Sequence, residues 1–206
     1  RELDRMERKG DDYHNRVREG FLSLAKDRPG FAVVDATASP EAVHAAVIAL
    51  VEKVRAPFAK DLARTIGKTD SLLYRRGNFN GTFDDLICNA MLAERDAEIA
   101  LSPGFRWGGT LLPEENITWE HVTNATAITY PNCYRNQMSG GQLKEVLEDI
   151  ADNIFHPDPY FQGGGDMVRI GGMGYAIDIS KPFGSRISNL THLKSGKPIE
   201  ASKNYT

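Results

Sequence analysis

The hydrophobic side chains of this 206-residue chain recur with two different periods, and the change of period limits the fold class. Residues 3–24, 83–91 and 143–154 carry apolar side chains three, four or seven positions apart, the spacing of one helix face. From residue 167 onward, short apolar runs alternate with glycine-rich turns, which is typical of strands. The sequence therefore predicts an α+β protein with helices early and a sheet-rich end.

The first segment predicts a helix, a strand and a second helix. Charged residues fill the gaps of the first helical face through Lys26, and Arg28-Pro29-Gly30 then ends it. The β-branched run 31–35 predicts a buried strand. Ser39 followed by Pro40 is an N-cap with proline at the first helical position, so a second helix is expected over about 41–54.

The remainder predicts a succession of helices and strands. Pro57 interrupts the helical pattern or starts a new helix that runs to Gly67. Thr82 and Asp85 resemble a capping box for the helix 83–91, and Thr118 can cap a short helix. The strands that we expect cover residues 71–74, 98–101, 167–170, 175–179 and 186–193.

Composition excludes several classes of partner. The net charge is −3 and no block of Lys and Arg stands without acidic neighbours, so we expect neither nucleic acid nor a membrane surface as a partner. The first residues are charged, so no signal peptide is visible. No apolar stretch reaches the ~20 residues of a membrane span. Cys88 and Cys133 lack CxxC spacing, and one disulfide between them stays open.

Conventional catalytic and metal-binding signatures are absent from the sequence. The histidines form no HxH or HExxH set, so we expect no metal bound by this chain alone. No GxSxG segment is present, and we expect no catalytic residue in this chain. The glycine run 163–174 lacks a following Gly-Lys-Ser/Thr, which favours a hairpin over a nucleotide loop.

The loop 74–82 is the first candidate binding segment. Arg75, Arg76, Asn78 and Asn80 stand in it together with two glycines, directly before a predicted helix N-terminus. Free backbone N–H groups and the positive helix end favour an anion at such a place. A loop that only caps its own helix explains the same residues equally well.

The loop 102–109 is the second candidate. Arg106 lies between Phe105 and Trp107, where a planar guanidinium can hold a sulfonate, phosphate or carboxylate. Stacking of the arginine on Trp107 is the alternative. Tyr130 precedes Pro131 and offers an aromatic face to a ligand, although a tyrosine beside proline also packs turns.

Several segments resemble the SoxB thiosulfohydrolases of the 5′-nucleotidase superfamily. They include YRRGNFNGTFDDLI, SPGFRWG, ITYP, LEDIADNIFHPDPYFQ and GGDMVRIGGMGY, and the likeness covers about residues 54–206. The resemblance implies a 5′-nucleotidase C-terminal-like substrate-binding domain that is truncated at its end. It also implies a separate metallophosphatase domain that holds two manganese ions, so the chain alone is expected to be inactive.

The same resemblance assigns roles to residues. Arg106 would contact the anionic part of the substrate, Tyr130 would occupy the place of a base-stacking aromatic, and Arg75, Arg76, Asn78 and Asn80 would line the same cleft. The substrate would be a cysteine-S-thiosulfonate on a sulfur-carrier protein in the periplasm, hydrolysed to release sulfate. A plain 5′-nucleotidase domain and a non-catalytic module that captures the carrier are the alternatives.

Residues 1–53 resemble a different family. RELDRMERKGDDYHNRVREGFLSLA followed by VVDATASPEAVHAAV is similar to the C-terminal tail of thymidylate kinase, which is cytoplasmic and has a P-loop kinase-like fold. That resemblance places Asp35, Ala36 and Thr37 near the adenine of ATP. The P-loop itself is absent, so we expect negligible phosphorylation of dTMP. We expect an incomplete chain in which two families join inside one helix near Val54, by nature or by sequence assembly.

Overall fold

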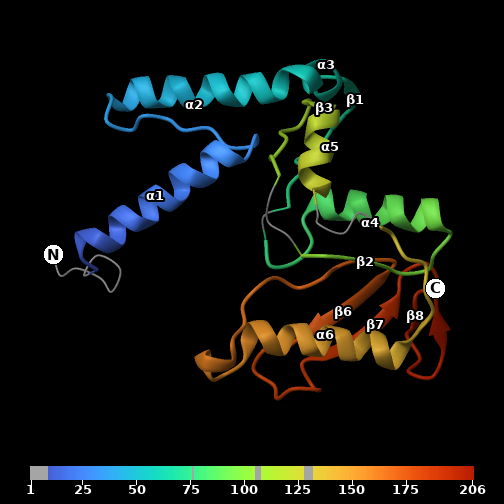
Figure 1. The fold of residues 1–206 in the computed structure, drawn as a ribbon. Coiled ribbons are helices and arrows are strands. Elements are labelled where there is room, and N and C mark those ends of the chain that lie inside the picture. The colour runs from blue at the N-terminus through green and yellow to red at the C-terminus, as the bar shows by residue number, and fades with distance from the viewer. Residues whose placement is uncertain (1–8, 76, 105–107, 128–131) are drawn as a thin grey trace. The chain divides into compact units, whose positions relative to one another are not determined.

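The computed structural model describes residues 9–75, 77–104, 108–127 and 132–206 (Figure 1). It divides into two compact units, Arg1–Lys60 and Asp61–Thr206. The predicted boundary at 53/54 lies inside a continuous helix, seven residues before the division between the units.

The helices of the described residues include two short 3-10 turns, labelled η. Their bounds are α1 Asp11–Asp27, α2 Pro40–Arg55, η1 Ala56–Phe58, α3 Ala59–Leu62, α4 Thr82–Arg95, α5 Trp119–Thr126, α6 Gly140–Phe155 and η2 Pro159–Phe161.

The strands of the described residues are short and all belong to the second unit. Their bounds are β1 Thr65–Lys68, β2 Ala100–Ser102, β3 Asn116–Thr118, β4 Met138–Ser139, β5 Arg169–Gly171, β6 Met173–Ile177, β7 Ile187–His192, β8 Lys197–Pro198 and β9 Asn204–Tyr205.

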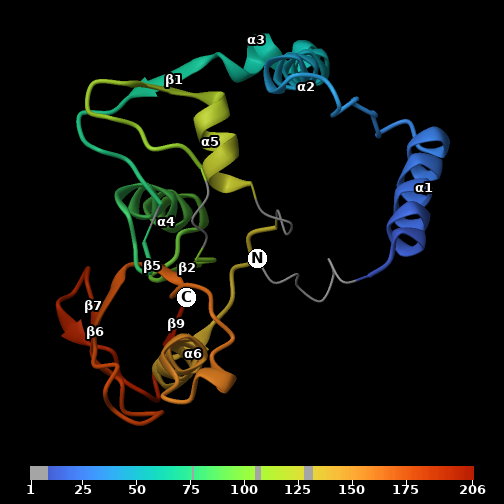
Figure 2. The same cartoon turned by 90° about the vertical axis from the view of Figure 1, so that its left-hand side faces the viewer.

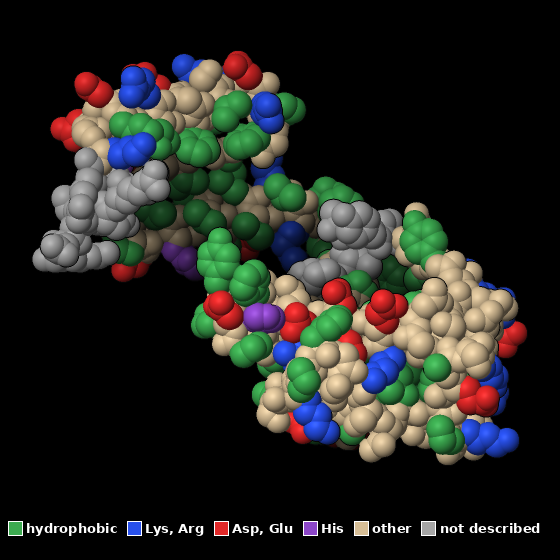
Figure 3. Space-filling view, turned by 90° about the horizontal axis from the view of Figure 1, so that it is seen from below, with side chains coloured by type: hydrophobic (Ala, Val, Ile, Leu, Met, Phe, Trp, Pro, Cys, Tyr) green, Lys and Arg blue, Asp and Glu red, His purple; other side chains and the backbone are tan. Residues whose placement is uncertain are grey.

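Helices α1 and α2 form most of the first unit. Ser39 caps α2 by accepting a hydrogen bond of 3.3 Å from the backbone N–H of Ala42, with Pro40 at the first helical position as predicted. None of the described residues of this unit is buried. On the face shown in Figure 3, hydrophobic side chains reach the surface and basic and acidic residues are interspersed.

The second unit contains four small antiparallel sheets among its described residues. Strands pair as β1 with β3, β2 with β5, β4 with β9, and β6 with β7 and β8. Helix α4 packs on the β2–β5 pair, while α6 packs on β7 (Figure 2). The predicted α+β class is confirmed.

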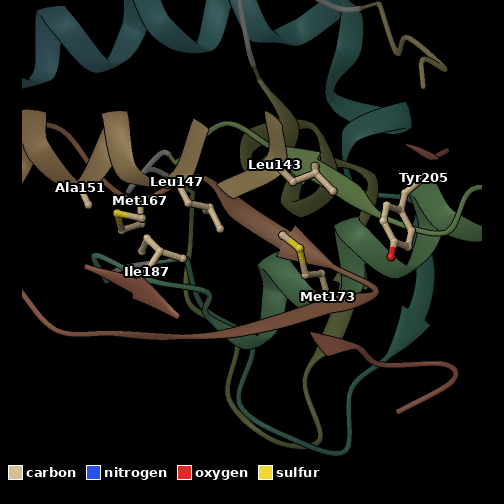
Figure 4. Packing of buried hydrophobic residues seen from close by; sticks show 7 residues of the cluster. All are labelled: Leu143, Leu147, Ala151, Met167, Met173, Ile187 and Tyr205. Atoms are coloured by element: carbon tan, nitrogen blue, oxygen red, sulfur yellow. The ribbon is translucent and has the colours of Figure 1, made fainter. Parts of the chain in front are cut away.

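Two clusters of buried apolar residues hold the second unit together. The larger lies between α6 and the strands that follow it, and Figure 4 shows its members, namely Leu143, Leu147, Ala151, Met167, Met173, Ile187 and Tyr205. The smaller joins the N-terminal end of α4 to its neighbours through Leu73, Phe83, Leu111 and Ala125. Full burial of a Leu, Ile, Met or Phe side chain in these clusters contributes about 1.5–3 kcal/mol.

Some predicted elements are wrong. Residues 31–35 form no strand, and Phe31 and Val33 are 50% and 65% exposed, because no described segment of the first unit supplies a strand to pair with. The helix expected to reach Gly67 ends at Leu62, and Thr65–Lys68 pairs with β3 instead. The strand expected at 71–74 is reduced to one bridge between Leu73 and Leu111.

Other elements were shifted or missed. Only the part of the first predicted helix from Lys9 onward lies in the described residues, and it is helical from Asp11, with Gly10 as the N-cap. The predicted capping box of α4 is displaced by one residue and only half of it forms. Gly81 is the N-cap and has no side-chain acceptor, while the carboxylate of Asp84 accepts from its N–H at 2.9 Å. Strands β4, β8 and β9 have two residues each and gave no periodic signal.

Glu148 fastens the loop before β7 onto α6. Its side chain is 3% exposed and accepts hydrogen bonds from the backbone N–H groups of Gly184, Arg186 and Ile187 at 3.0, 3.2 and 2.7 Å. Lys144, one helical turn earlier, places its ammonium 4.0 Å from the same carboxylate. One acidic side chain therefore satisfies three backbone donors, two in the loop before β7 and one at the first residue of β7.

We expect Glu148→Ala to lower the free energy of unfolding by about 3 kcal/mol or more, because three N–H groups lose their acceptor in a buried place. Urea denaturation followed by circular dichroism measures the change. The matched control is Glu145→Ala on the exposed face of the same helix, which should change stability by about 0.5 kcal/mol at most. Equal losses in the two variants would contradict the assignment.

Candidate functional site

Three loops of the second unit meet beside the N-terminus of α4. The backbone N–H of Met167 donates to the carbonyl of Asn78 at 3.0 Å, which joins the loop before β5 to the loop before α4. A Cβ added at Gly104 would lie 2.4 Å from the carbonyl oxygen of Met167 and 2.9 Å from Cβ of Asp166. Only glycine allows this approach, so the loop after β2 closes against the same place.

The carboxylate of Asp84 is the node of this junction. Its Oδ1 accepts a hydrogen bond from Nε of Arg75 at 2.6 Å. Its Oδ2 accepts from the backbone N–H of Gly81 and lies 3.5 Å from Nε of Arg169. The exposed fractions of the Arg75, Asp84 and Arg169 side chains are 3%, 0% and 0%. Because a buried ion loses its hydration, removing one partner of such a set costs about 3–5 kcal/mol.

Arg75 points into the domain. Besides Asp84, its guanidinium donates through Nη1 to the carbonyl of Ala125 and through Nη2 to the carbonyl of Pro103 at 3.2 Å. All three nitrogens thus bond to the protein, which favours a packing role over substrate contact for this residue. Its bonds connect the loop before α4 with the end of α5 and the start of the Arg106 loop.

Asn80 is also engaged internally. Its Nδ2 donates to Oδ1 of Asp85 and to the carbonyl of Ile170, both at 2.8 Å, and its Oδ1 accepts from the N–H of Ile170 at 3.0 Å. The side-chain amide therefore pairs with β5 as a strand residue would. These bonds place Asn80 in the framework of the loop.

Asn78 has the outward position in this loop. Its side chain is exposed, while its backbone carbonyl is held by Met167. Arg76, Arg106 and Tyr130 lie outside the described residues. Their roles in substrate binding stay predictions, as does that of Asn78.

The flanks of the Arg106 loop are fixed on both sides. Gly104 lies against Asp166 and Met167, as described above, and Gly108 has φ +95° with its Cβ position 3.3 Å from Cα of Ala125. A left-handed φ and close packing both favour glycine at position 108. The backbone thus enters and leaves residues 105–107 at defined places.

The adenine-loop prediction falls on a local turn of the first unit. The carboxylate of Asp35 accepts from the N–H and the hydroxyl of Thr37 at 2.9 and 2.7 Å, and the hydroxyl bond is the main cause that lowers the pKa of Asp35. All three residues of the Asp35–Thr37 turn are exposed. An open hollow beside this turn is lined by Val33, Val34, Asp35, Ala38, Ala42, Ala46, Ala49, Leu50 and Lys53.

Asp84 and Arg169 were not among the residues that the sequence singled out. A signal was present for Arg169, because it is a charged residue inside the apolar run Met167–Ile170 of a predicted strand. Asp84 was considered only for helix capping. Their joint role depends on contacts between segments about 90 residues apart, which no local pattern encodes.

The described residues contain no group of three or more His, Cys, Asp or Glu side chains that could hold a metal ion. Nor does this part of the chain contain a helix long and apolar enough to cross a membrane.

Comparison with known proteins gives a consistent result for the second unit. The model of the family described as 5′-nucleotidase, C-terminal domain matches residues 65–206. The structure of sulfate thiohydrolase SoxB from Thermus thermophilus superposes with a TM-score of 0.73 and 36% identity, over 78% of this chain and 30% of that chain. The 5′-nucleotidase precursor from Thermus thermophilus gives 0.57 and 23%, over 81% and 33%.

Short matches to a second family are also present. Thymidylate kinase of Bifidobacterium longum is 53% identical over 45 residues, which are 21% of this chain and 22% of the kinase. The enzyme of Prosthecochloris aestuarii is 48% identical over 44 residues, 21% of this chain and 20% of the kinase. The chain thus spans about a fifth of these kinases and 30% of the SoxB structure.

The thiols of Cys88 and Cys133 should differ in reactivity. Both cysteines are free, with Cys88 buried and Cys133 exposed. Burial, with the charges of Asp84 and Asp85, raises the pKa of Cys88 to about 12. The stabilising effect of the neutral thiol is complete below its unfolded pKa of ~8.5 and is lost as the pH rises toward the folded value.

We therefore expect iodoacetamide at pH 8 to alkylate Cys133 in the native protein and Cys88 only after unfolding, because ~10⁻⁴ of the buried thiol is thiolate. Mass spectrometry of tryptic peptides measures both sites. Cys133→Ser is the control and should show no native labelling. Alkylation of native Cys88 at the rate of Cys133 would disprove the expectation.

Proposed function

Since this chain belongs to the family of 5′-nucleotidase C-terminal domains, we propose that its second unit is the substrate-binding domain of a SoxB-like thiosulfohydrolase. The observation that carries the proposal is the 36% identity to Thermus thermophilus SoxB at a TM-score of 0.73. The match to the 5′-nucleotidase precursor, at 23% identity, supports the fold alone.

The proposal divides the work between two domains. This chain would bind the cysteine-S-thiosulfonate of a sulfur-carrier protein. Two manganese ions, held by a metallophosphatase domain outside residues 1–206, would activate the water that releases sulfate.

Arg106, Tyr130, Arg76 and Asn78 are the residues that we propose to face the substrate. A guanidinium suits the terminal sulfonate, because its planar fork donates to two oxygens at once. Exposure of the Asn78 side chain, with its backbone fixed, leaves its amide available to a ligand. Arg75 and Asn80 would support the loop from behind through the contacts described above.

The carrier protein is the partner in this proposal, and the periplasm is the compartment in which SoxB-like enzymes act. Nucleic acid and membrane are not proposed as partners. A genuine kinase-like first unit would instead favour the cytoplasm.

Two alternatives have observations of their own. A 5′-nucleotidase domain is supported by the family model, and its parent enzyme would hydrolyse a nucleoside monophosphate. A thymidylate kinase remnant is supported by the short kinase matches. The sequence holds no P-loop, so ATP-dependent phosphorylation of dTMP is expected at background level.

A domain replacement tests the proposal. Residues 65–206 would replace the matching segment of Thermus thermophilus SoxB, and the chimera would receive a carrier peptide with a cysteine-S-thiosulfonate. We expect sulfate release, measured by ion chromatography, within about tenfold of the parent enzyme, and phosphate release from AMP at background. Arg106→Ala in the chimera should lower kcat/KM about 100-fold, through loss of a charge-assisted bidentate contact.

Arg135→Ala is the matched control for the arginine substitution. Arg135 is exposed and donates to the carbonyls of Arg95 and Asp96 at 2.8 and 2.9 Å, at the far end of α4. This variant should stay within about twofold of the unmodified chimera. Faster hydrolysis of AMP than of the thiosulfonate would favour the nucleotidase, and a folded chimera that hydrolyses neither would contradict the proposal.

A further inference from the structure

Arg169 is a fully buried cation whose hydrogen bonding within the described residues is incomplete. It lies on β5 with no exposed surface, and its Nη2 donates to the carbonyl of Gly77 at 2.5 Å. Nε lies 3.5 Å from Asp84 and Nη2 lies 3.7 Å from Asp166. Among the described residues, Nε and Nη1 have no hydrogen bond of good geometry. Replacing a whole buried ion-pair set by apolar residues of similar volume is commonly neutral or stabilising, so the presence of this charged set suggests a role for Arg169 beyond stability.

The bond to Gly77 falls between two of the residues proposed to face the substrate. Arg76 precedes this glycine and Asn78 follows it, so the carbonyl that Arg169 holds belongs to the peptide unit joining residues 77 and 78. The carbonyl of Asn78 is held in turn by Met167, two residues before Arg169. The segment 167–169 therefore fixes consecutive carbonyls of the candidate binding loop.

In the loop 74–82, some groups bond to the rest of the domain and others are exposed. The side chains of Arg75 and Asn80, the carbonyl of Gly77 and the N–H of Gly81 are bonded inward. Asn78 and Phe79 have exposed side chains between these anchors. Such an arrangement leaves a short arc free for a ligand and fixes the backbone on both sides of it.

The same cluster reaches the Arg106 loop. Arg75, which shares Asp84 with Arg169, donates to the carbonyl of Pro103 at 3.2 Å. Asp166, which pairs with Arg169, packs against Gly104. These two contacts at the start of the second candidate loop are made by residues linked to Arg169, Asp166 directly and Arg75 through Asp84.

We propose that Arg169 is a positioning residue that, with Asp84 and Asp166, fixes the backbone of the loop carrying Asn78 and the start of the next loop at Pro103 and Gly104, for binding of one sulfonate-type anion. The proposal rests on the function proposed above. Arg169 does not touch the ligand, because its side chain is fully buried. It acts by fixing the backbone positions of the residues that contact the ligand.

Two measurements on the full chain test the proposal in Arg169→Met. Hydrogen exchange by mass spectrometry should show at least about tenfold faster exchange in peptides covering 75–81 and 103–108, with α6 unchanged, because the loops lose a fixed carbonyl. Calorimetric titration with a peptide bearing a cysteine-S-thiosulfonate should show about tenfold weaker binding.

Arg186→Met is the matched control. Arg186 is 2% exposed, pairs with Asp152 at 2.5 Å and donates to the carbonyl of Lys181 at 3.0 Å, so it is a buried, ion-paired arginine of the same domain. Faster exchange should be confined to about residues 178–187, and the affinity should stay within about twofold. Arg169→Lys keeps the charge but not the fork, and should fall between the wild type and Arg169→Met. It replaces Arg169→Met if that variant does not fold.

The outcomes separate the two proposals. Unchanged exchange in the two loops overturns the positioning role, whatever the affinity. Faster exchange with unchanged affinity overturns it as well, since Arg169 is then only structural. The proposed function is overturned if the wild-type chain does not bind the thiosulfonate peptide, even where Arg169→Met speeds exchange in the two loops. The substrate-directed role of Arg169 then falls with it.

Discussion

The carboxylate of Asp84 is the interaction on which the second unit depends. It caps α4, pairs with Arg75 and lies beside Arg169, all without solvent contact. A buried carboxylate needs such partners, because its lost hydration costs several kcal/mol. Each of the three charged groups is therefore the reason that the other two can be buried. The conformations of the loop before α4 and of the entry to β5 follow from this mutual requirement, and substitutions within the set should not be additive.

Local patterns predicted the parts of the fold whose causes are local. Helices α2, α4, α5 and α6 follow from apolar spacing and from capping residues within a few positions of each helix. The strand predicted at 31–35 failed because a strand exists only through its partner, and a β-branched run supplies none. Strands β4 and β9 show the converse, since two residues define no period and their pairing joins segments more than 60 residues apart.

The candidate site shows the same limit at the level of side chains. The sequence placed two arginines and two asparagines in one loop and left anion binding and self-capping equally open. In the structure Arg75 and Asn80 bond inward to other segments and Asn78 is exposed, while anion binding by this loop stays a prediction. That division depends on where Asp84, Ile170 and Met167 arrive from distant parts of the chain, which adjacent residues do not reveal.

The junction of the two family resemblances illustrates why packing and sequence can place a boundary differently. The resemblances meet near Val54, inside α2, whereas the compact units divide between Lys60 and Asp61. An α-helix requires only continuous backbone bonding and suitable propensity, so it can continue across a change of ancestry without a break. The 3-10 turn at Ala56–Phe58 accommodates Pro57 near its start and continues the helical path to α3. A boundary between compact units falls where contacts between residues change, and here that place lies inside α3, beyond the end of α2.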